Sequence, residues 1–375
     1  MDMLVRTPRP YETESLLGYV LRVSEENGYD TPTRMLKATG AAGVSGTSFD
    51  ISLKVLSALV GGEIANLSKL AYRETGSQNL YLLGRPVCAK FGRSMLRLSS
   101  PAFCPHCVKD SGYIDGIWDL ALIAACPKHK CAVINRCHCC EKGLSYHRPG
   151  ILTCNCGADL AGAPALPVSE QIAALMEIIL AKIHGRSVLT GPHRAEFPLE
   201  HLEPLSLLDF CELLSQLARH ALHLHRNANN DDHLLAAKMV SDVLCDWPMG
   251  FHQLLHRIAS KFPTSADRPS SLRPLLKHFY SPMFGNQDRG TKFKFLHDEF
   301  IRFVRTQIAA SENTKNFYQS GAASSSWAPK VLILRAFGLN ERAFKIFTDH
   351  FDIQMRIDFS TGRMIRYFDF SLFES

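Results

Sequence analysis

Apolar residues recur at helical spacing through the first part of the chain. Between Thr13 and Gly28 they fall three or four positions apart, with Thr13 placed to cap a helix and Gly28 placed to end it. Further on, the segment "DISLKVLSALVGGEIANLSKLAY" predicts two short helices broken at Gly61 and Gly62. This layout predicts an N-terminal helical domain of the helix-turn-helix kind over residues 1–100, although any small helical bundle contains such pairs.

A second helical region follows a cysteine-rich middle. A Pro- and Ala-rich linker, "AGAPALPVSE", leads into a predicted helix over residues 170–184 that stops at Gly185. Two longer segments with helical periodicity follow between residues 205 and 262. We therefore expect three domains: the helical domain at 1–100, a tandem zinc-finger block at 101–163 and a C-terminal helical domain at 164–375.

The pattern changes from helix to strand near the C-terminus. The segment "WAPKVLILRAFGLNERAFKIFTDHF" predicts a helix from Pro329, a glycine turn capped by Asn340, and a second helix. Period-two alternation then predicts a β-hairpin that returns through "RMIRYFDF". Its first strand has one apolar face, made by Ile353, Met355, Ile357 and Phe359. Residues 327–370 are a candidate winged helix-turn-helix, and the expected fold class is mainly α with small β elements.

Length and composition are typical of a multidomain cytoplasmic protein. The chain has 375 residues, of which 46% are hydrophobic. A chain of this length is too long to fold around one small core. No apolar stretch reaches the roughly 18 to 20 residues that span a bilayer. Residues 1–10 lack the apolar core of a signal peptide. These features predict a cytoplasmic protein, in which thiols stay reduced.

The formal net charge of +6 and the pI near 8.7 are compatible with a nucleic-acid partner and equally with an ordinary basic surface. Two basic segments hold the candidate contact residues. Each segment has three possible roles: it contacts phosphate, it contacts a protein partner, or it is an ordinary solvated surface. The candidates are Arg85, Lys90, Arg93, Arg97, Arg342, Lys345, Arg356, Arg363 and Arg366.

Nine of the twelve cysteines lie between Cys104 and Cys156. Such local clustering in a reducing compartment indicates metal binding rather than a disulfide framework. Cys104-Pro-His-Cys107 is a knuckle that supplies two zinc ligands from one tight turn. Cys126-Pro-Lys-His129 is a second two-ligand turn of the same length, so the two turns predict a Cys₃His zinc site. His106 is expected to point away from it.

A second zinc is predicted on Cys137, Cys140, Cys154 and Cys156. The run "CHCC" leaves its ligand set open, because Cys139 is an alternative to Cys137 or Cys140. Gly143 and Gly157 stand where turns after a knuckle need a positive φ. The remaining cysteines are expected to be free buried thiols: Cys88, Cys131, Cys211 and Cys245.

Four protein ligands at each site favour structural zinc, since a catalytic zinc keeps one position for water. The His-x-Glu element that precedes Pro-Cys-x-x-Cys in zinc deaminases is missing, as are a Walker A loop and a Gly-x-Ser-x-Gly elbow. We therefore expect two structural zinc ions and no enzyme activity. A zinc-dependent hydrolase or nuclease is the alternative from another class.

Taken together, the motifs resemble the TniQ/TnsD family of transposon target-selection proteins. The resemblance rests on the N-terminal "P-x-x-x-E-S-L" entry at Pro10 to Leu16, "CPHC", a Trp, "CPKHK" and a second cysteine set ending in "CNCG". It covers about the first 165 residues, and it places the family's zinc ligands on the same eight residues as above. Helix-turn-helix elements of this family also dock proteins, so a basic helix alone does not establish DNA contact.

The resemblance implies a non-enzymatic adaptor that chooses where a transposon lands. Implied partners are target DNA, an AAA+ ATPase, the transposase and, in CRISPR-associated transposons, a Cascade complex with guide RNA, which relatives bind as homodimers. Other members read a fixed attachment site directly and tend to be longer. The compact chain therefore favours the CRISPR-associated kind, with a sequence-specific DNA-binding selector as the alternative.

Overall fold

The computed structural model divides the chain into two compact units. One is Met1–Leu222 with Asn227–Cys245, and the other is His223–Arg226 with Asp246–Ser375. The expected boundaries near residues 100 and 163 both lie within the first unit. The structure describes residues 4–40, 51–72, 79–88, 95–190, 196–224, 232–261, 272–284, 291–310, 327–336, 341–350, 353–359 and 364–369.

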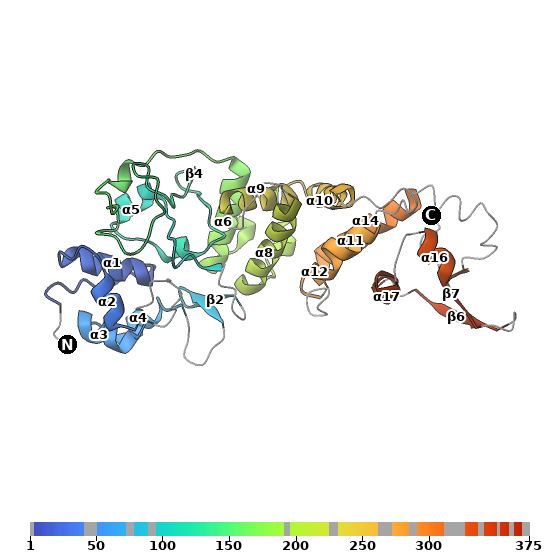
Figure 1. The fold of residues 1–375 in the computed structure, drawn as a ribbon, viewed down its shortest axis with the longest axis horizontal. Coiled ribbons are helices and arrows are strands. Elements are labelled where there is room, and N and C mark those ends of the chain that lie inside the picture. Colours follow the sequence, from blue (N-terminus) through green and yellow to red (C-terminus); the bar gives the residue numbers. More distant parts are fainter. Residues whose placement is uncertain are drawn as a thin grey trace. The chain divides into compact units, whose positions relative to one another are not determined.

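The N-terminal part of the first unit is helical, as predicted (Figure 1). Its helices are α1 (Leu16–Glu26), α2 (Thr33–Ala38), α3 (Leu53–Val60) and α4 (Ile64–Ser68). Gly28 ends α1 with φ +73°, and Gly61 separates α3 from α4 with φ +60°. The predicted cap was wrong, because Ser15 caps α1 by accepting a hydrogen bond from the Gly18 amide at 3.2 Å. Thr13 instead donates to the Asp115 carboxylate at 2.7 Å.

The cysteine-rich block contains little regular structure. A hairpin of β1 (Leu80–Leu82) and β2 (Arg85–Cys88) precedes it. Inside it lie α5 (Pro105–Ser111), the 3₁₀ turns η2 (Gly116–Asp119) and η3 (Leu160–Gly162), and the two-residue strands β3 (Ala125–Cys126) and β4 (Cys131–Ala132). Because these elements are so short, contacts between side chains hold most of the block together.

Helices complete the first unit (Figure 1). They are α6 (Glu170–Ile183), the 3₁₀ turn η4 (Val188–Thr190), α7 (Leu199–Leu202), α8 (Leu207–Leu224) and α9 (His233–Leu244). Ser169 caps α6, and Gly185 follows its end with φ +65°. Helix α6 contacts both α9 and β3, so the helical segment continues the body of the cysteine-rich block.

Aromatic packing dominates the helical part of the second unit. The elements are α10 (Met249–Lys261), α11 (Leu272–Leu275), the π-helical turn η5 (Leu276–Tyr280), α12 (Ser281–Phe284) and α14 (Lys294–Ala310). Phe279 and Phe300 stack with ring centroids 5.7 Å apart, and Phe251 and Phe284 pack against Phe279. Among the described residues of the whole chain, no helix is long and apolar enough to cross a membrane.

The C-terminal elements follow the predicted order of two helices and a hairpin. They are β5 (Trp327–Pro329), α16 (Lys330–Ala336), α17 (Glu341–His350), β6 (Met355–Asp358) and β7 (Ile365–Asp369). The strands form an antiparallel sheet in the order β5-β7-β6. Strand β5 was not predicted, and the helix expected from Pro329 begins at Lys330. The predicted cap Asn340 lies outside the described residues. The fold is mainly α, as predicted.

Candidate metal centres

Four ligand atoms of the first predicted site converge. The Nδ1 atom of His129 lies 3.4, 3.3 and 3.6 Å from the Sγ atoms of Cys104, Cys107 and Cys126. The Sγ atoms of Cys107 and Cys126 lie 3.6 Å apart. Zinc bonds of about 2.3 Å to sulfur and about 2.0 Å to nitrogen place tetrahedral ligands about 3.5 Å apart. The donor set and its spacing therefore fit one tetrahedral zinc ion.

Local backbone structure places these donors. Cys104 is the N-cap of α5, with Pro105 in the first helical turn, so Cys107 lies on the first turn of the same helix. The short β3–β4 pairing joins Cys126 to Cys131 and closes the turn that carries His129. Within that turn the His129 amide donates to the Cys126 sulfur at 3.3 Å. Each two-ligand turn is thus built locally.

The histidine ligand has a charged neighbour on its other side. His129 Nε2 lies 3.7 Å from the Asp110 carboxylate, which also forms an ion pair with Lys128 at 2.9 Å. Because Nδ1 faces the thiols, the second nitrogen is left to carry its proton towards Asp110. Carboxylates in this position orient the imidazole of zinc sites and strengthen its basicity.

Two neighbours of the first cluster stay outside the ligand set. Cys131 is buried with its sulfur 3.9 Å from that of Cys104, and the four clustered donors exclude it. The His106 ring lies 5.4 Å from the His129 ring, measured between centroids. Sequence reasoning identified both as bystanders, but it did not foresee that Cys131 contacts a ligand thiol.

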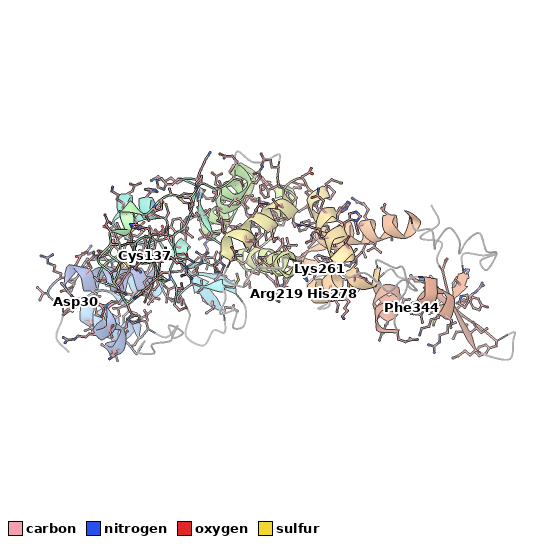
Figure 2. The ribbon with its side chains drawn as sticks, turned by 45° about the horizontal axis from the view of Figure 1, so that its top comes forward. Asp30, Cys137, Arg219, Lys261, His278 and Phe344 are labelled. Carbon is pink, nitrogen blue, oxygen red and sulfur yellow. The ribbon has the colours of Figure 1, made fainter. Side chains whose placement is uncertain are left out.

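The second cluster joins Cys137, Cys140, Cys154 and Cys156, whose sulfur atoms lie within 4.8 Å of one another. Cys137 lies 3.7 Å from Cys156, and Cys140 lies 3.8 Å from Cys154. Cys139 is exposed and outside the cluster, so the geometry favours Cys137 and Cys140 as the knuckle pair. Figure 2 labels Cys137 within the first unit.

The backbone around the second cluster favours a thiolate at Cys137. The Cys140 amide, together with that of Cys139, lowers the pKa of Cys137 to about 6. Gly157 has φ +84°, as predicted. The same prediction was wrong for Gly143, because Glu141 takes the left-handed position with φ +57°. The knuckle completes its turn two residues earlier than the glycine indicated.

Both donor sets suit zinc and a structural role. Thiolate sulfur and imidazole nitrogen are the ligands that structural zinc prefers, and four of them fill a tetrahedron without an open position. Zinc bound by these side chains would clamp segments that have almost no regular secondary structure. The two clusters are therefore candidate sites for two structural zinc ions.

A buried polar network joins the N-terminal helices to the cysteine-rich block. The Asp119 carboxylate accepts hydrogen bonds from the hydroxyls of Tyr72 and Tyr146, at 2.8 and 2.6 Å. The Ser15 hydroxyl lies 3.2 and 3.3 Å from the same two hydroxyls. Burial raises the pKa of Asp119 to about 6. Sequence reasoning missed this network because its members are scattered along the chain and share no motif.

The predicted contact residues have different surroundings. Arg97 is buried and donates to the Ala121 carbonyl at 2.6 Å, and burial lowers its pKa to about 10. The surface role expected of Arg97 is therefore wrong. Arg85 is exposed, beside Gly185. Exposed in the second unit are Lys345, Arg356 and Arg366. Lys90, Arg93, Arg363 and the side chain of Arg342 lie outside the described part of the chain.

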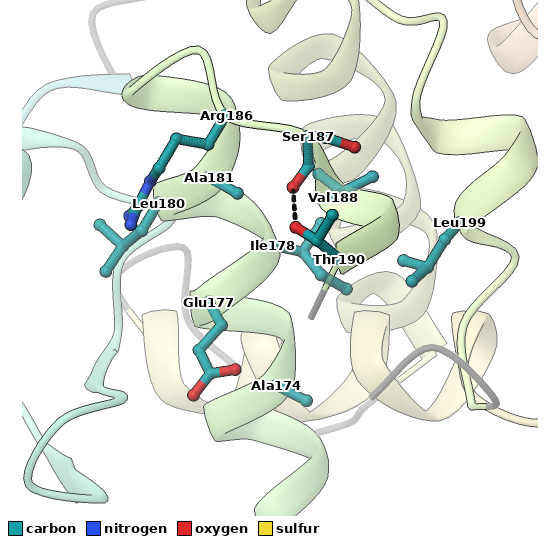
Figure 3. A pocket seen from close by; sticks show the side chains of 10 residues that line it. All are labelled: Ala174, Glu177, Ile178, Leu180, Ala181, Arg186, Ser187, Val188, Thr190 and Leu199. Carbon is teal, nitrogen blue, oxygen red and sulfur yellow. Dashed lines mark hydrogen bonds between the residues drawn. The ribbon is translucent and has the colours of Figure 1, made fainter. Parts of the chain in front are cut away.

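A separate pocket of about 240 Å³ lies between α6, η4 and α7 (Figure 3). Its lining is largely aliphatic, from residues such as Ile178, Val188 and Leu199, with Glu177 and Arg186 as its charged members. It holds no thiol or imidazole among its lining residues, so it is not a zinc site. Among the described residues of the first unit, the candidate metal ligands lie in the two clusters and not in this pocket.

Comparison with known proteins supports the resemblance noted in the sequence. Residues 5–133 match the model of a family described as TniQ. The match includes the N-terminal helices and the whole first cluster, and it ends before Cys137. No curated protein matches the chain. The TniQ family is associated with target selection in DNA transposition. Residues 5–133 of the chain are therefore similar to the TniQ family.

Proposed function

We propose that the protein is a non-enzymatic target-selection adaptor that links an RNA-guided Cascade complex to the transposition machinery. The observation that carries this proposal is the TniQ match over residues 5–133. In this role the protein binds Cascade with its guide RNA on one side and an AAA+ ATPase and the transposase on the other. We propose that it acts as a homodimer.

The construction of the first unit supports a role in binding rather than in turnover. Each candidate zinc site has four protein ligands, and such sites stabilise a fold instead of activating water. The clusters and the network around Asp119 hold loop-rich segments in one compact body. A rigid body of this kind presents fixed surfaces, which lowers the entropy cost of docking a large partner.

A second candidate is a selector that recognises an attachment site through its own DNA contacts. The charge distribution favours it: residues 246–375 contain 18 Lys and Arg against 12 Asp and Glu, whereas residues 1–245 contain 24 of each. The entire formal net charge therefore lies in the C-terminal part. Lys345 on α17 and Arg366 on β7 are exposed there, where a helix pair and a sheet follow the order of a winged helix.

A co-purification experiment separates the two candidates. Tagged full-length protein is expressed with Cascade subunits, with and without a guide RNA, and the captured proteins and RNA are identified. The adaptor proposal predicts capture of Cascade together with its guide. A stable complex with one specific duplex, and none with Cascade under any condition, would support the selector instead.

A turnover assay addresses the hydrolase or nuclease alternative. Zinc-loaded protein is incubated with single- and double-stranded DNA and RNA, and cleavage is followed on a gel. The adaptor proposal predicts none. Cleavage that disappears in a folded Cys104→Ser variant would contradict it.

A further inference from the structure

The three-stranded sheet of the second unit has one face that packs against a helix. Phe368 on β7 and Ala328 on β5 are buried, and they stand opposite each other in the strand register. The Phe344 ring of α17 meets the Phe368 ring edge-on, with centroids 4.8 Å apart. This contact identifies the face that belongs to the core of the C-terminal elements.

The opposite face carries two aromatic rings and an arginine. Arg356 on β6 stands opposite Tyr367 on β7. Pro329 also stands opposite Tyr367, so Trp327, two residues before Pro329, shares this face because side chains alternate along a strand. The Arg356 guanidinium carbon lies 4.7 Å from the centroid of the Trp327 ring and 5.4 Å from that of Tyr367.

These three side chains are open to solvent. Arg356 is exposed, and both rings are half-buried, so none of them belongs to the core around Phe368. Guanidinium and ring planes at these separations are in cation–π contact. The Arg356 guanidinium therefore lies close to both rings on this face of the sheet. The result is a surface of planar groups around one guanidinium. By strand register, Asp369 opposite Trp327 and Asp358 two residues after Arg356 stand on the same face.

The planar groups of this surface match unpaired nucleobases. Bases without a pairing partner stack on aromatic rings and on arginine planes, especially on open sheet faces, while the phosphates beside them are attracted to positive charge. In a duplex the faces of the bases are covered by their neighbours. The net charge of residues 246–375, with its 18 basic and 12 acidic side chains, adds long-range attraction for a polyanion.

We propose that Trp327, Arg356 and Tyr367 form a stacking site for unpaired bases of a single-stranded nucleic acid. The site is independent of the adaptor role, since it requires neither Cascade nor the ATPase. RNA and single-stranded DNA share the chemistry that it recognises. Measuring the affinity for each distinguishes RNA from single-stranded DNA as the ligand.

Fluorescence anisotropy with the full-length zinc-loaded protein tests the site. The probes are a labelled, unstructured RNA of about 12 nucleotides, the DNA of the same sequence and the corresponding duplex, at about 0.15 M salt. We expect one or both single strands to bind more tightly than the duplex. Trp327→Ala and Tyr367→Ala should each weaken single-strand binding by about fivefold or more. Trp327→Phe, which keeps an aromatic plane, should retain most of it.

Matched substitutions on the helix-packed side of the sheet distinguish stacking from simple charge. Arg366 stands opposite Ile357 in the register, on the face of Phe368, and Phe359 continues the alternation of Met355 and Ile357 with 65% of its surface exposed. Arg356→Lys keeps the charge but loses the plane, so it should weaken binding more than Arg366→Lys does. Phe359→Ala should leave binding within about twofold, below the contribution of one stack.

Three results would overturn the proposal. One is a duplex affinity equal to or above the single-strand affinity. Another is unchanged binding in Trp327→Ala and Tyr367→Ala proteins whose thermal unfolding matches the wild type. The third is an equal effect of Arg356→Lys and Arg366→Lys, which would show that the guanidinium plane beside the two rings makes no specific contribution.

Discussion

The carboxylate of Glu14 accepts two hydrogen bonds from Arg22, at 2.7 Å from Nε and 2.8 Å from Nη2, and both side chains are buried. Burial raises the pKa of Glu14, although the hydrogen bonds from Arg22 act in the opposite direction. Ser15, the next residue, caps α1. The "E-S-L" part of the N-terminal motif is therefore architectural, because its polar members fix the first helix.

Replacing Glu14 by Gln should lower the free energy of unfolding by about 3 kcal/mol, since the buried Arg22 would lose its buried counter-charge and keep only the partly exposed Glu26, 3.1 Å from Nη1. Urea unfolding of the zinc-loaded protein measures the change. Asp242→Asn is the matched control, because its ion pair with Lys238 is exposed, at 50% and 60% of the side-chain surfaces. We expect a loss below about 1 kcal/mol there. Equal losses of unfolding free energy in the two variants would show that the buried Glu14–Arg22 pair contributes no more to stability than an exposed ion pair does.

Asp119 should give the first unit a pH-dependent stability. Burial raises its pKa from 3.8 to about 6, so the folded protein holds this proton more tightly than the unfolded chain. The stability from Asp119 is complete below its unfolded pKa and is lost as the pH rises through its folded pKa. Between about pH 5 and pH 7 the wild type should lose about 1 kcal/mol relative to Asp119→Asn.

Urea unfolding of the two zinc-loaded proteins at several pH values measures this difference. Protonation of the zinc ligands acts on both proteins and cancels in the comparison. Parallel stability curves for wild type and variant would mean that Asp119 ionises in the fold as it does in the unfolded chain.

Zinc content should separate the two clusters. The purified protein is expected to hold two zinc ions per chain, and Cys104→Ser or Cys156→Ser should each remove one, because three remaining ligands bind structural zinc more weakly. Cys139→Ser should keep both, since Cys139 is exposed outside the cluster. Metal analysis by plasma mass spectrometry counts the ions. A single zinc lost on Cys139→Ser would reverse the assignment of the second cluster.

Gly185 should be the most sensitive helix-ending glycine in the first unit. Its φ is +65°, and a Cβ there would lie 2.5 Å from Nη2 of Arg85. Gly28 has φ +73° with no neighbour within 4 Å, so Gly28→Ala reports the backbone strain alone, about 1 kcal/mol. Gly185→Ala should cost about 0.5 kcal/mol more, because it displaces Arg85 from the carboxyl end of α6.

Thermal unfolding of the single and double variants measures this excess. In an Arg85→Ala background the excess should disappear, while the strain common to both glycines should remain. An excess that persists in that background would show that Arg85 does not interact with the end of α6.

Features set by neighbouring residues were predictable from the sequence. The helix ends at Gly28, Gly61 and Gly185 follow from the ability of glycine to adopt positive φ. Pairing of the eight candidate zinc donors follows from knuckle spacing, because each two-ligand turn is built within four residues. The choice of N-cap for α1 was not predictable in the same way. Thr13 and Ser15 can both cap a helix by residue type, and only the fold shows which one does.

Features set by distant residues appeared only in the structure. Arg97 looks like a surface cation by composition, yet it is buried and bonded to Ala121. Tyr72, Asp119 and Tyr146 meet in one network although 74 positions separate the first from the last. Spacing alone also left Cys139 equivalent to its neighbours, and the chain geometry around the second cluster excludes it.

The sequence by itself determined the helical character, the two donor sets and the alternating strands of the C-terminal hairpin, because periodicity and knuckle spacing act over a few residues. Tertiary structure decided which polar side chains are buried, which thiol is left out, and which face of the C-terminal sheet carries Trp327, Arg356 and Tyr367. Burial and strand pairing depend on segments brought together by folding, and their contacts are not encoded by spacing along the chain.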